Sequence, residues 1–247
     1  MHTVVDLVAR VVLFPVLIVQ AMAVRRTAQQ LREPPGPRSG RRGKGRVLRV
    51  LIIGDSSAAG VGAGSQETAL SGQLTKGLAQ HYLVDWRLVA KTGATTGSTL
   101  RAMKKQLPRR WDVVVVSLGV NDVTRAVPLA MWLRQQGRLV NILEQRFEAK
   151  RIYLSGLPPM GQFPLLPHPL RWVLGQQARR LDQGLRTFAE KQARCRYLAL
   201  DVTEDPALMA EDGFHPGPSI YAEWAAQLVT AITSDWAARD GLQSRQE

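Results

Sequence analysis

The sequence predicts a three-layer α/β domain built on a five-stranded parallel sheet, and three observations support this prediction. Short apolar runs alternate with longer stretches of helical periodicity. Three of the runs are almost continuously β-branched or aliphatic, which is typical of parallel strands buried on both faces. Glycine directly follows two of them, at Gly54 and Gly119. Strands joined by crossover helices form a doubly wound sheet, with helices covering both faces.

We expect each element at a definite place in the chain. The strands are predicted at residues 47–53, 84–90, 112–118, 151–155 and 196–201. The helices are predicted around residues 66–80, 97–107, 126–149, 171–194 and 217–238. One domain therefore covers residues 47–238, and a C-terminal tail covers residues 239–247.

The positive charge is concentrated in the N-terminal part of the chain. The net charge is +13, but residues 1–49 contain ten Lys and Arg against two acidic residues. The rest of the chain is only weakly basic, which argues against a nucleic-acid-binding protein. Cys195 is the only cysteine, so intramolecular disulfides and cysteine zinc clusters are excluded.

An apolar stretch from Val4 to Val24 predicts a hydrophobic helix in residues 1–26, interrupted early by Asp6 and Arg10. We interpret it as a membrane anchor. A cleaved signal peptide and a helix lying on a surface are the alternatives. The basic excess begins after the apolar stretch, at Arg25, which predicts a cytoplasmic catalytic domain. The signal-peptide alternative would instead export the protein.

Residues 27–46 form a basic segment rich in Pro and Gly. Residues 33–46 contain no apolar side chain except proline, which predicts a flexible linker. Its arginines and lysine could bind anionic lipid head groups, or could only keep the linker in solution.

The first candidate for catalysis is Ser56, in Gly54-Asp55-Ser56-Ser57 at the end of the first predicted strand. Open α/β sheets bind ligands at the carboxyl ends of their strands, where this hydroxyl would lie. A neutral serine needs a neighbouring base to act as a nucleophile. The nearby Gly60–Gly64 stretch fits neither a dinucleotide fingerprint nor a phosphate-binding loop.

His215 is the candidate base, because it alone among the four histidines has a carboxylate, Asp212, three residues before it. That spacing can place the carboxylate on the imidazole Nδ1 and leave Nε2 facing the serine. Asn121 follows the third predicted strand and could donate its amide N–H to an oxyanion. Gly93, after the second strand, could add a backbone N–H, and Gly97 is a rival for this role.

Together, and in this order, these segments resemble the SGNH (GDSL-type) hydrolase family over about residues 47–235. The matching residues are Ser56, Gly93, Asn121 and His215, the last within Asp212-Gly213-Phe214-His215-Pro216. The resemblance implies a flavodoxin-like sheet and an acyl-enzyme mechanism. Ser56 would attack an ester, His215 would move the proton, and Asp212 would orient His215. Ser56, Gly93 and Asn121 would form the oxyanion hole. No cofactor or metal is implied, and we expect Asp55 to be a structural hydrogen-bond acceptor.

The substrate is less well defined than the chemistry. An apolar, proline-rich segment at residues 157–170 could be a lid or an acyl-binding rim, or could pack its leucines onto the core. With the hydrophobic N-terminus, it favours hydrophobic or lipid-like esters. The alternatives are a carbohydrate or small-molecule deacetylase on the same fold and a non-catalytic membrane-tethered scaffold.

Overall fold

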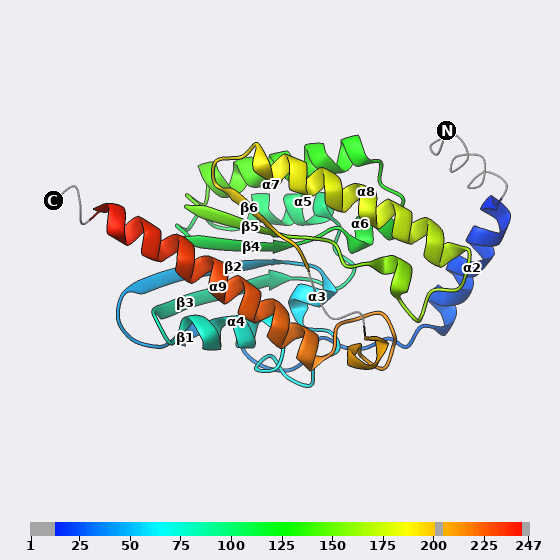
Figure 1. Cartoon of the computed structure of the whole chain (residues 1–247), viewed down its shortest axis with the longest axis horizontal. Helices are drawn as coiled ribbons and strands as arrows, with labels where there is room; N and C mark the ends of the chain where they lie inside the picture. The colour runs from blue at the N-terminus through cyan, green and yellow to red at the C-terminus, as the bar shows by residue number, and fades with distance from the viewer. Residues whose placement is uncertain (1–12, 201–204, 244–247) are drawn as a thin grey trace.

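The computed structural model of the protein describes residues 13–200 and 205–243. Figure 1 shows a central sheet between two layers of helices. The strands are β1 (Ser39–Arg42), β2 (Val47–Gly54), β3 (Leu83–Ala90), β4 (Val113–Ser117), β5 (Arg151–Ser155) and β6 (Cys195–Leu198). Their order in the sheet is β1-β3-β2-β4-β5-β6. Strands β2 to β6 are parallel, as predicted, and β1 pairs with β3 in the antiparallel direction.

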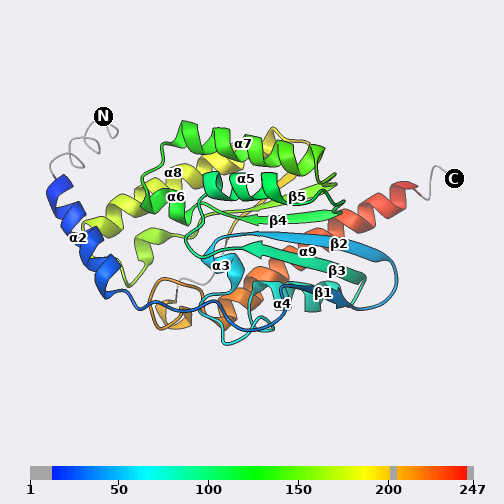
Figure 2. The same cartoon turned by 180° about the vertical axis from the view of Figure 1, so that it is seen from behind.

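The helices cover the sheet in two groups. They are α2 (Phe14–Thr27), α3 (Ser56–Ala59), α4 (Leu70–Leu78), α5 (Thr96–Lys105), α6 (Val120–Thr124), α7 (Leu129–Gln145), α8 (Leu170–Glu190) and α9 (Pro218–Gln243), with short 3₁₀ turns at Met160–Gln162 and Pro206–Leu208. Helices α5, α7 and α8 lie on one face of the sheet, and α4 and α9 lie on the other (Figures 1 and 2). The three-layer prediction is confirmed.

The alternation of side chains along β2 explains why both faces are covered. Leu51 and Ile53 belong to the core cluster that includes residues of α5, α7 and α8. Val50 and Ile52 belong to the second cluster, which includes residues of α4 and α9. Because successive side chains of a strand point to opposite faces, a continuous apolar run needs a hydrophobic layer on each side.

The prediction of a flexible linker was wrong for residues 39–42, and residues 33–38 also make ordered contacts. Strand β1 lies within this segment and adds a sixth strand at the edge of the sheet. Glu33 accepts hydrogen bonds from Thr92 N and Thr92 Oγ1 at 2.9 and 2.8 Å, and it pairs with Arg38 at 2.7 Å. Backbone pairing with β3 and these polar contacts hold the segment, so apolar side chains were not required.

The hydrophobic N-terminal segment forms helix α2 over Phe14–Thr27, while the predicted interruptions at Asp6 and Arg10 lie outside the described residues. One side of α2 packs against the domain, through Leu17, Ala21 and Val24. Within residues 13–200 and 205–243, no helix is long and apolar enough to cross a membrane.

Candidate active site

The serine loop begins where β2 ends. A Cβ at Gly54 would lie 2.5 Å from the Ser117 carbonyl oxygen and 2.4 Å from Ala58 Cβ, so only glycine allows the end of β2 to lie this close to β4 and α3. Asp55 caps the short helix α3, because its side chain accepts a hydrogen bond from Ser57 N. Ser56 is the first residue of α3 and is 7% exposed. The tight turn thus places the Ser56 hydroxyl at the carboxyl edge of the sheet.

A hydrogen-bonded chain of three side chains connects Ser56 to the loop before α9. His215 Nε2 lies 2.9 Å from Ser56 Oγ, and His215 Nδ1 lies 2.6 Å from Asp212 Oδ2. The other oxygen, Asp212 Oδ1, accepts hydrogen bonds from the backbone N–H groups of Phe214 and His215 at 3.0 and 2.9 Å. A carboxylate on Nδ1 holds the ring with Nε2 toward the serine, which is the arrangement of a nucleophile, a base and an orienting acid.

The pKa of Asp212 is lowered from its usual value. Burial alone would raise this pKa, but the hydrogen bonds from the His215 ring and from the His215 and Phe214 backbone lower it more. Asp212 therefore stays ionised, and an ionised carboxylate can stabilise a positive charge that forms on His215.

Asn121 and Gly93 lie at the same edge of the sheet as Ser56. Asn121, in α6, donates from Nδ2 to Asp55 Oδ2 at 3.3 Å, which links it to the serine loop. Gly93 has φ +76°, and a Cβ there would meet nothing within 4 Å, so the space above it is open. Its carbonyl accepts a hydrogen bond from Arg125 at 3.1 Å. Within the described residues, no hydrogen bond joins Gly93 to Ser56.

Gly97 occupies a different environment from Gly93. It lies inside α5, and a Cβ on it would contact the Gln135 side chain at 3.2 Å. A packing role against α7 therefore explains Gly97. A Cβ on Gly93 would meet no such contact, so this packing constraint applies to Gly97 and not to Gly93.

A buried hydrogen-bond network that the sequence did not suggest holds the loops of Gly93 and Asn121 together. Asp122 Oδ2 accepts from Thr96 N at 3.0 Å and from Thr96 Oγ1 at 2.9 Å. Trp132 Nε1 donates to Thr96 Oγ1 at 2.9 Å. Burial raises the pKa of Asp122 despite the Thr96 hydrogen bonds, which lower it. The only local signal was the aspartate of Gly119-Val120-Asn121-Asp122, and its partners are distant in sequence.

Asp55 also has more contacts at the site than expected. Burial raises its pKa to about 6, although the Ser57 backbone N–H, the charge of His215 and the Asn121 amide all lower it. Its two oxygens accept from Ser57 N and from Asn121 Nδ2. This agrees with the expected structural acceptor and identifies Asn121 as the group that it positions.

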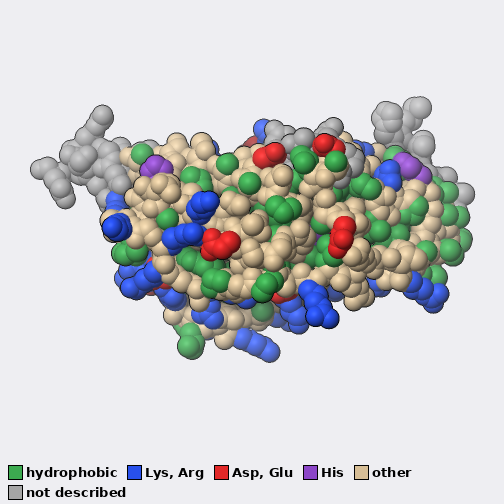
Figure 3. All heavy atoms as spheres, turned by 90° about the horizontal axis from the view of Figure 1, so that it is seen from below, with side chains coloured by type: hydrophobic (Ala, Val, Ile, Leu, Met, Phe, Trp, Pro, Cys, Tyr) green, Lys and Arg blue, Asp and Glu red, His purple; other side chains and the backbone are tan. Residues whose placement is uncertain are grey.

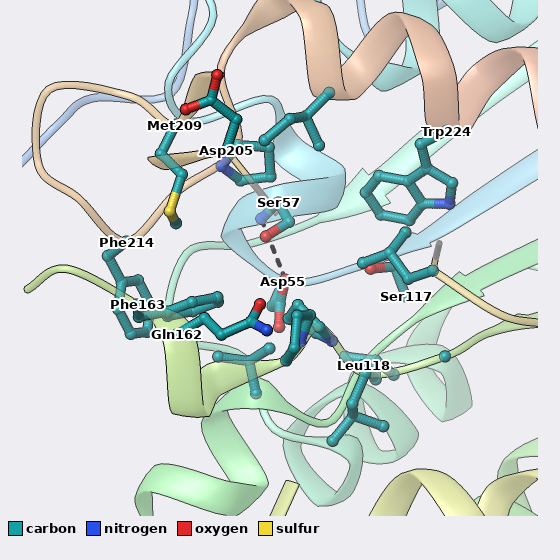
Figure 4. A pocket seen from close by; sticks show the side chains of 18 residues that line it. Asp55, Ser57, Ser117, Leu118, Gln162, Phe163, Asp205, Met209, Phe214 and Trp224 are labelled. Carbon is teal, nitrogen blue, oxygen red and sulfur yellow. Dashed lines mark hydrogen bonds between the residues drawn. The ribbon is translucent and has the colours of Figure 1, made fainter. Parts of the chain in front are cut away.

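An apolar pocket is lined by chain neighbours of Ser56 and His215, although neither of these two residues lines it (Figure 4). Asp55 and Ser57, which flank the serine, line it, as does Phe214, which precedes the histidine. The empty space in and around it, open solvent included, amounts to about 830 Å³. Most of the other lining side chains are apolar, among them Leu118, Leu157, Phe163, Met209, Ile220 and Trp224.

The segment at residues 157–170 divides between the core and the pocket. Met160, Leu166 and Leu170 are buried in the core cluster, so part of it packs onto the domain. Leu157, Pro158, Pro159, Gln162 and Phe163 line the pocket. The first half of the segment is therefore a pocket wall.

An α/β sheet that carries a serine, a histidine and an aspartate in one hydrogen-bonded chain at its carboxyl edge defines the class of serine hydrolases. The chain belongs to the GDSL-like Lipase/Acylhydrolase family, whose sequence model matches residues 52–223. This match confirms the resemblance inferred from the motifs.

Individual relatives agree with this classification. The chain is 26% identical over 198 residues to the GDSL-like esterase Rv1075c of Mycobacterium tuberculosis, a match that covers 75% of this chain and 62% of the relative. The chain thus spans about three fifths of that relative's length.

Solved structures of esterases share the fold. A psychrotrophic esterase, EstA, from Pseudoalteromonas sp. superimposes with a TM-score of 0.57 at 20% identity, covering 76% of this chain and 98% of that one. A carbohydrate esterase family 2 enzyme from Corynascus thermopiles (Myceliophthora fergusii) gives a TM-score of 0.60 at 16% identity. The match covers 83% of this chain and 69% of that one. At these identities the likeness establishes the fold alone.

Proposed function

We propose that the protein hydrolyses carboxylic esters through an acyl-enzyme formed on Ser56. The observation that carries this proposal is the continuous path from Ser56 Oγ to His215 Nε2, 2.9 Å, and from His215 Nδ1 to Asp212 Oδ2, 2.6 Å. Family membership supports the same reaction class. Because the path joins residues 159 positions apart, a surface-loop role for His215 does not account for it.

In the first half of the reaction, Ser56 Oγ bonds to the ester carbonyl carbon while its proton moves to His215 Nε2. Asp212 stabilises the resulting imidazolium. The tetrahedral oxyanion accepts hydrogen bonds from the backbone N–H groups of Ser56 and Gly93 and from the Asn121 amide. The bond to the alcohol oxygen then breaks, and His215 gives its proton to the leaving alcohol.

In the second half, water attacks the acyl-enzyme. His215 takes a proton from the water, the same donors hold the second oxyanion, and the carbon–oxygen bond to Ser56 breaks with return of that proton to Oγ. The products are a carboxylic acid and free serine.

We further propose that the acyl group is hydrophobic. The pocket beside Ser56 is lined mainly by aliphatic and aromatic side chains, and its inner wall includes the buried Trp224 and Ile220. A sugar would leave its hydroxyl groups without hydrogen bonds against such a wall. Because the likeness to a carbohydrate esterase extends only to the fold, it does not favour the deacetylase alternative. Family membership and the joined side chains likewise favour an enzyme over a scaffold.

A chain-length series tests both parts of the proposal. Purified full-length protein is assayed with p-nitrophenyl acetate, butyrate, octanoate and palmitate, and with acetylated xylose. We expect kcat/KM to rise from acetate to longer acyl chains and a phosphonate inhibitor to abolish turnover. Turnover of acetylated xylose alone would contradict the hydrophobic acyl group, and absence of all turnover would contradict the esterase.

We also propose that the protein associates with a membrane on its cytoplasmic side. Support comes from the exposed apolar side chains of α2 and from Arg25 and Arg26 in its last turn, since anionic lipids of the cytoplasmic leaflet attract such basic groups. Fractionation of cells that produce the full chain, with protease accessibility of the catalytic domain, tests this. Recovery of a mature protein that starts near Val24 outside the cytoplasm would favour export instead.

A further inference from the structure

The outer side of helix α2 carries most of the exposed large hydrophobic side chains in the described part of the chain. Phe14 and Val19 are 60% and 62% exposed, and Val16, Ile18 and Met22 are exposed as well. Within the same part, only four other large hydrophobic side chains are exposed, and they lie in other elements: Val47, Leu107, Leu129 and Met131. Figure 3 shows hydrophobic side chains gathered at the right-hand end of the molecule, where α2 lies.

The opposite side of α2 is fixed to the domain. Leu17, Ala21 and Val24 pack against the core cluster. Between them, the Gln20 amide donates to His168 O at 2.6 Å and accepts from Leu170 N at 3.0 Å. These contacts determine which side of the helix faces outward. A helix that is apolar all round normally has a covering on every side, and here only one side is covered by the domain.

The charges around the exposed side indicate which covering fits. Arg25 and Arg26 are exposed in the last turn of α2, and Arg32 is exposed a few residues later. Residues 13–32 contain no Asp or Glu. Large apolar side chains bordered by arginine match the interface of an anionic bilayer, where the apolar groups enter the acyl region and the guanidinium groups meet phosphate.

The segments that hold α2 also border the pocket beside Ser56. Gln20 binds residues 168 and 170 of the segment that contributes Gln162 and Phe163 to the pocket. Just after α2, Gln29 donates to Glu211 at 2.7 Å, in the loop that contributes Met209 and Phe214. Figures 1 and 2 both show α2 next to these two segments.

The same end of the pocket is the one open to solvent. Gln162 and Asp205 are exposed, whereas Trp224 and Ile220 are buried. In Figure 4, Gln162, Phe163 and Phe214 lie together on one side of the pocket, and Trp224 lies on the other. A surface that contacts α2 would therefore be close to the pocket's mouth.

We propose that α2 lies in the plane of an anionic membrane surface, so that the pocket receives hydrophobic esters directly from that surface. The binding half of the proposal stands on the exposed side of α2, and the catalytic half rests on the proposed esterase activity. The partner is the lipid surface itself, and a second copy of the chain is the competing occupant.

The test uses full-length protein and sedimentation with phosphatidylcholine vesicles, with or without phosphatidylglycerol. The apolar variant combines Phe14→Gln, Val19→Gln and Met22→Gln, and its matched control combines Val47→Gln, Leu107→Gln and Met131→Gln. The charge variant combines Arg25→Gln and Arg26→Gln, with Arg101→Gln and Arg138→Gln, both exposed, as its control. Hydrolysis of p-nitrophenyl butyrate in solution and of p-nitrophenyl palmitate in vesicles is measured for each protein.

We expect the wild type to bind vesicles containing phosphatidylglycerol more tightly and to be released by alkaline carbonate. The apolar variant should lose about tenfold or more in binding and in palmitate hydrolysis, and the charge variant about fivefold or more in binding. Butyrate hydrolysis and both control variants should stay within about twofold, as expected for exposed sites away from a binding surface.

Several results would overturn the proposal. Vesicle binding that is equal for all variants would show that α2 does not contact the membrane surface. Resistance to carbonate would indicate a helix inserted across the bilayer. A dimer that the apolar variant converts to monomer, without a change in vesicle binding, would identify a second copy as the occupant. Absence of butyrate hydrolysis in the wild type would contradict the esterase, whereas its vesicle binding would still report on α2.

Discussion

The two loops that meet at the Ser56 hydroxyl each carry a buried aspartate, and the two carboxyl groups have opposite pKa shifts. Asp55 and Asp212 are 2% and 7% exposed, so both are largely shielded from water. Burial raises the pKa of Asp55 to about 6, while the pKa of Asp212 is lowered. Exposure alone therefore does not determine the charge of a carboxyl group at this site.

The difference follows from depth and from the donors around each group. Asp55 is enclosed more completely by protein and accepts two hydrogen bonds, of 3.1 and 3.3 Å. Asp212 accepts three, of which the one from His215 Nδ1 is 2.6 Å long. Short hydrogen bonds to a carboxylate stabilise its charged form and offset the cost of burial. We therefore expect Asp212 to stabilise a positive charge on His215, and Asp55 to position Asn121.

The largest expected loss of turnover comes from substituting the two residues that join the loops, Ser56 and His215. Ser56→Ala and His215→Ala should each lower kcat by about 10⁴-fold or more, because both are needed for one proton transfer and the loss of either disables the unit. Steady-state hydrolysis of p-nitrophenyl butyrate measures this, with circular dichroism to verify folding. Ser57→Ala is the matched control and should keep most of the activity. An active Ser56→Ala variant would mean that the nucleophile is a different residue.

The two aspartates should differ strongly in their effect on turnover. Asp212→Asn should lower kcat by about 10⁴-fold, because the amide cannot stabilise the imidazolium. Asp55→Asn should lower kcat by about tenfold or less, since it weakens hydrogen bonds to the groups that Asp55 positions. The same assay compares both variants. Equal losses would show that the serine loop carries an acid as important as Asp212.

Removing the amide that Asp55 positions should have an intermediate effect. Asn121→Ala should lower kcat by about 10²–10³-fold with little change in KM, as expected for the loss of one oxyanion donor. Saturation kinetics with p-nitrophenyl butyrate separate the two constants. If KM rose and kcat did not change, Asn121 would bind the ground state and its contact with Asp55 would have another purpose.

The smallest effect concerns stability, and its sign should be opposite for the two carboxyl groups. Because the pKa of Asp55 is higher in the folded state, its contribution to stability is present below about pH 4 and is lost as pH rises toward 6. Relative to Asp55→Asn, the wild type should thus lose up to about 3 kcal/mol in unfolding free energy across this range.

The lowered pKa of Asp212 gives the reverse dependence. Its contribution is present above the pKa of the unfolded chain and is lost as pH falls. Relative to Asp212→Asn, the wild type should become more stable as pH rises. Urea unfolding of the three proteins at several pH values between about 2 and 7 measures both differences, the Asp212 difference below about pH 4 and the Asp55 difference above it. The same slope for both variants would contradict the assigned pKa directions.

The sequence was sufficient for elements whose signal is local. The runs around Val50 and Val114 predict buried parallel strands because few other environments accept continuous β-branched side chains. Ser56 and Asn121 were identifiable because each follows such a strand directly. The Asp212–His215 contact was identifiable because the two residues lie three positions apart in one tight loop.

Features that depend on distant partners could not be read from the chain. Strand β1 is held by backbone pairing and by Glu33 with Thr92, and no apolar pattern marks it. The Thr96–Asp122–Trp132 network joins three elements through buried polar groups. The docking of α2 depends on Gln20, which looks like a polar interruption in an apolar helix.

The most direct test of the central claim is to locate the acyl-enzyme. The wild type is reacted with a p-nitrophenyl phosphonate, digested, and the peptide that contains both Ser56 and Ser57 is sequenced by tandem mass spectrometry. We predict a single adduct on Ser56 that forms at least about 10³-fold more slowly in His215→Ala, since His215 must take the proton. An adduct on Ser57, or one on Ser56 that forms at the same rate without His215, would contradict the account.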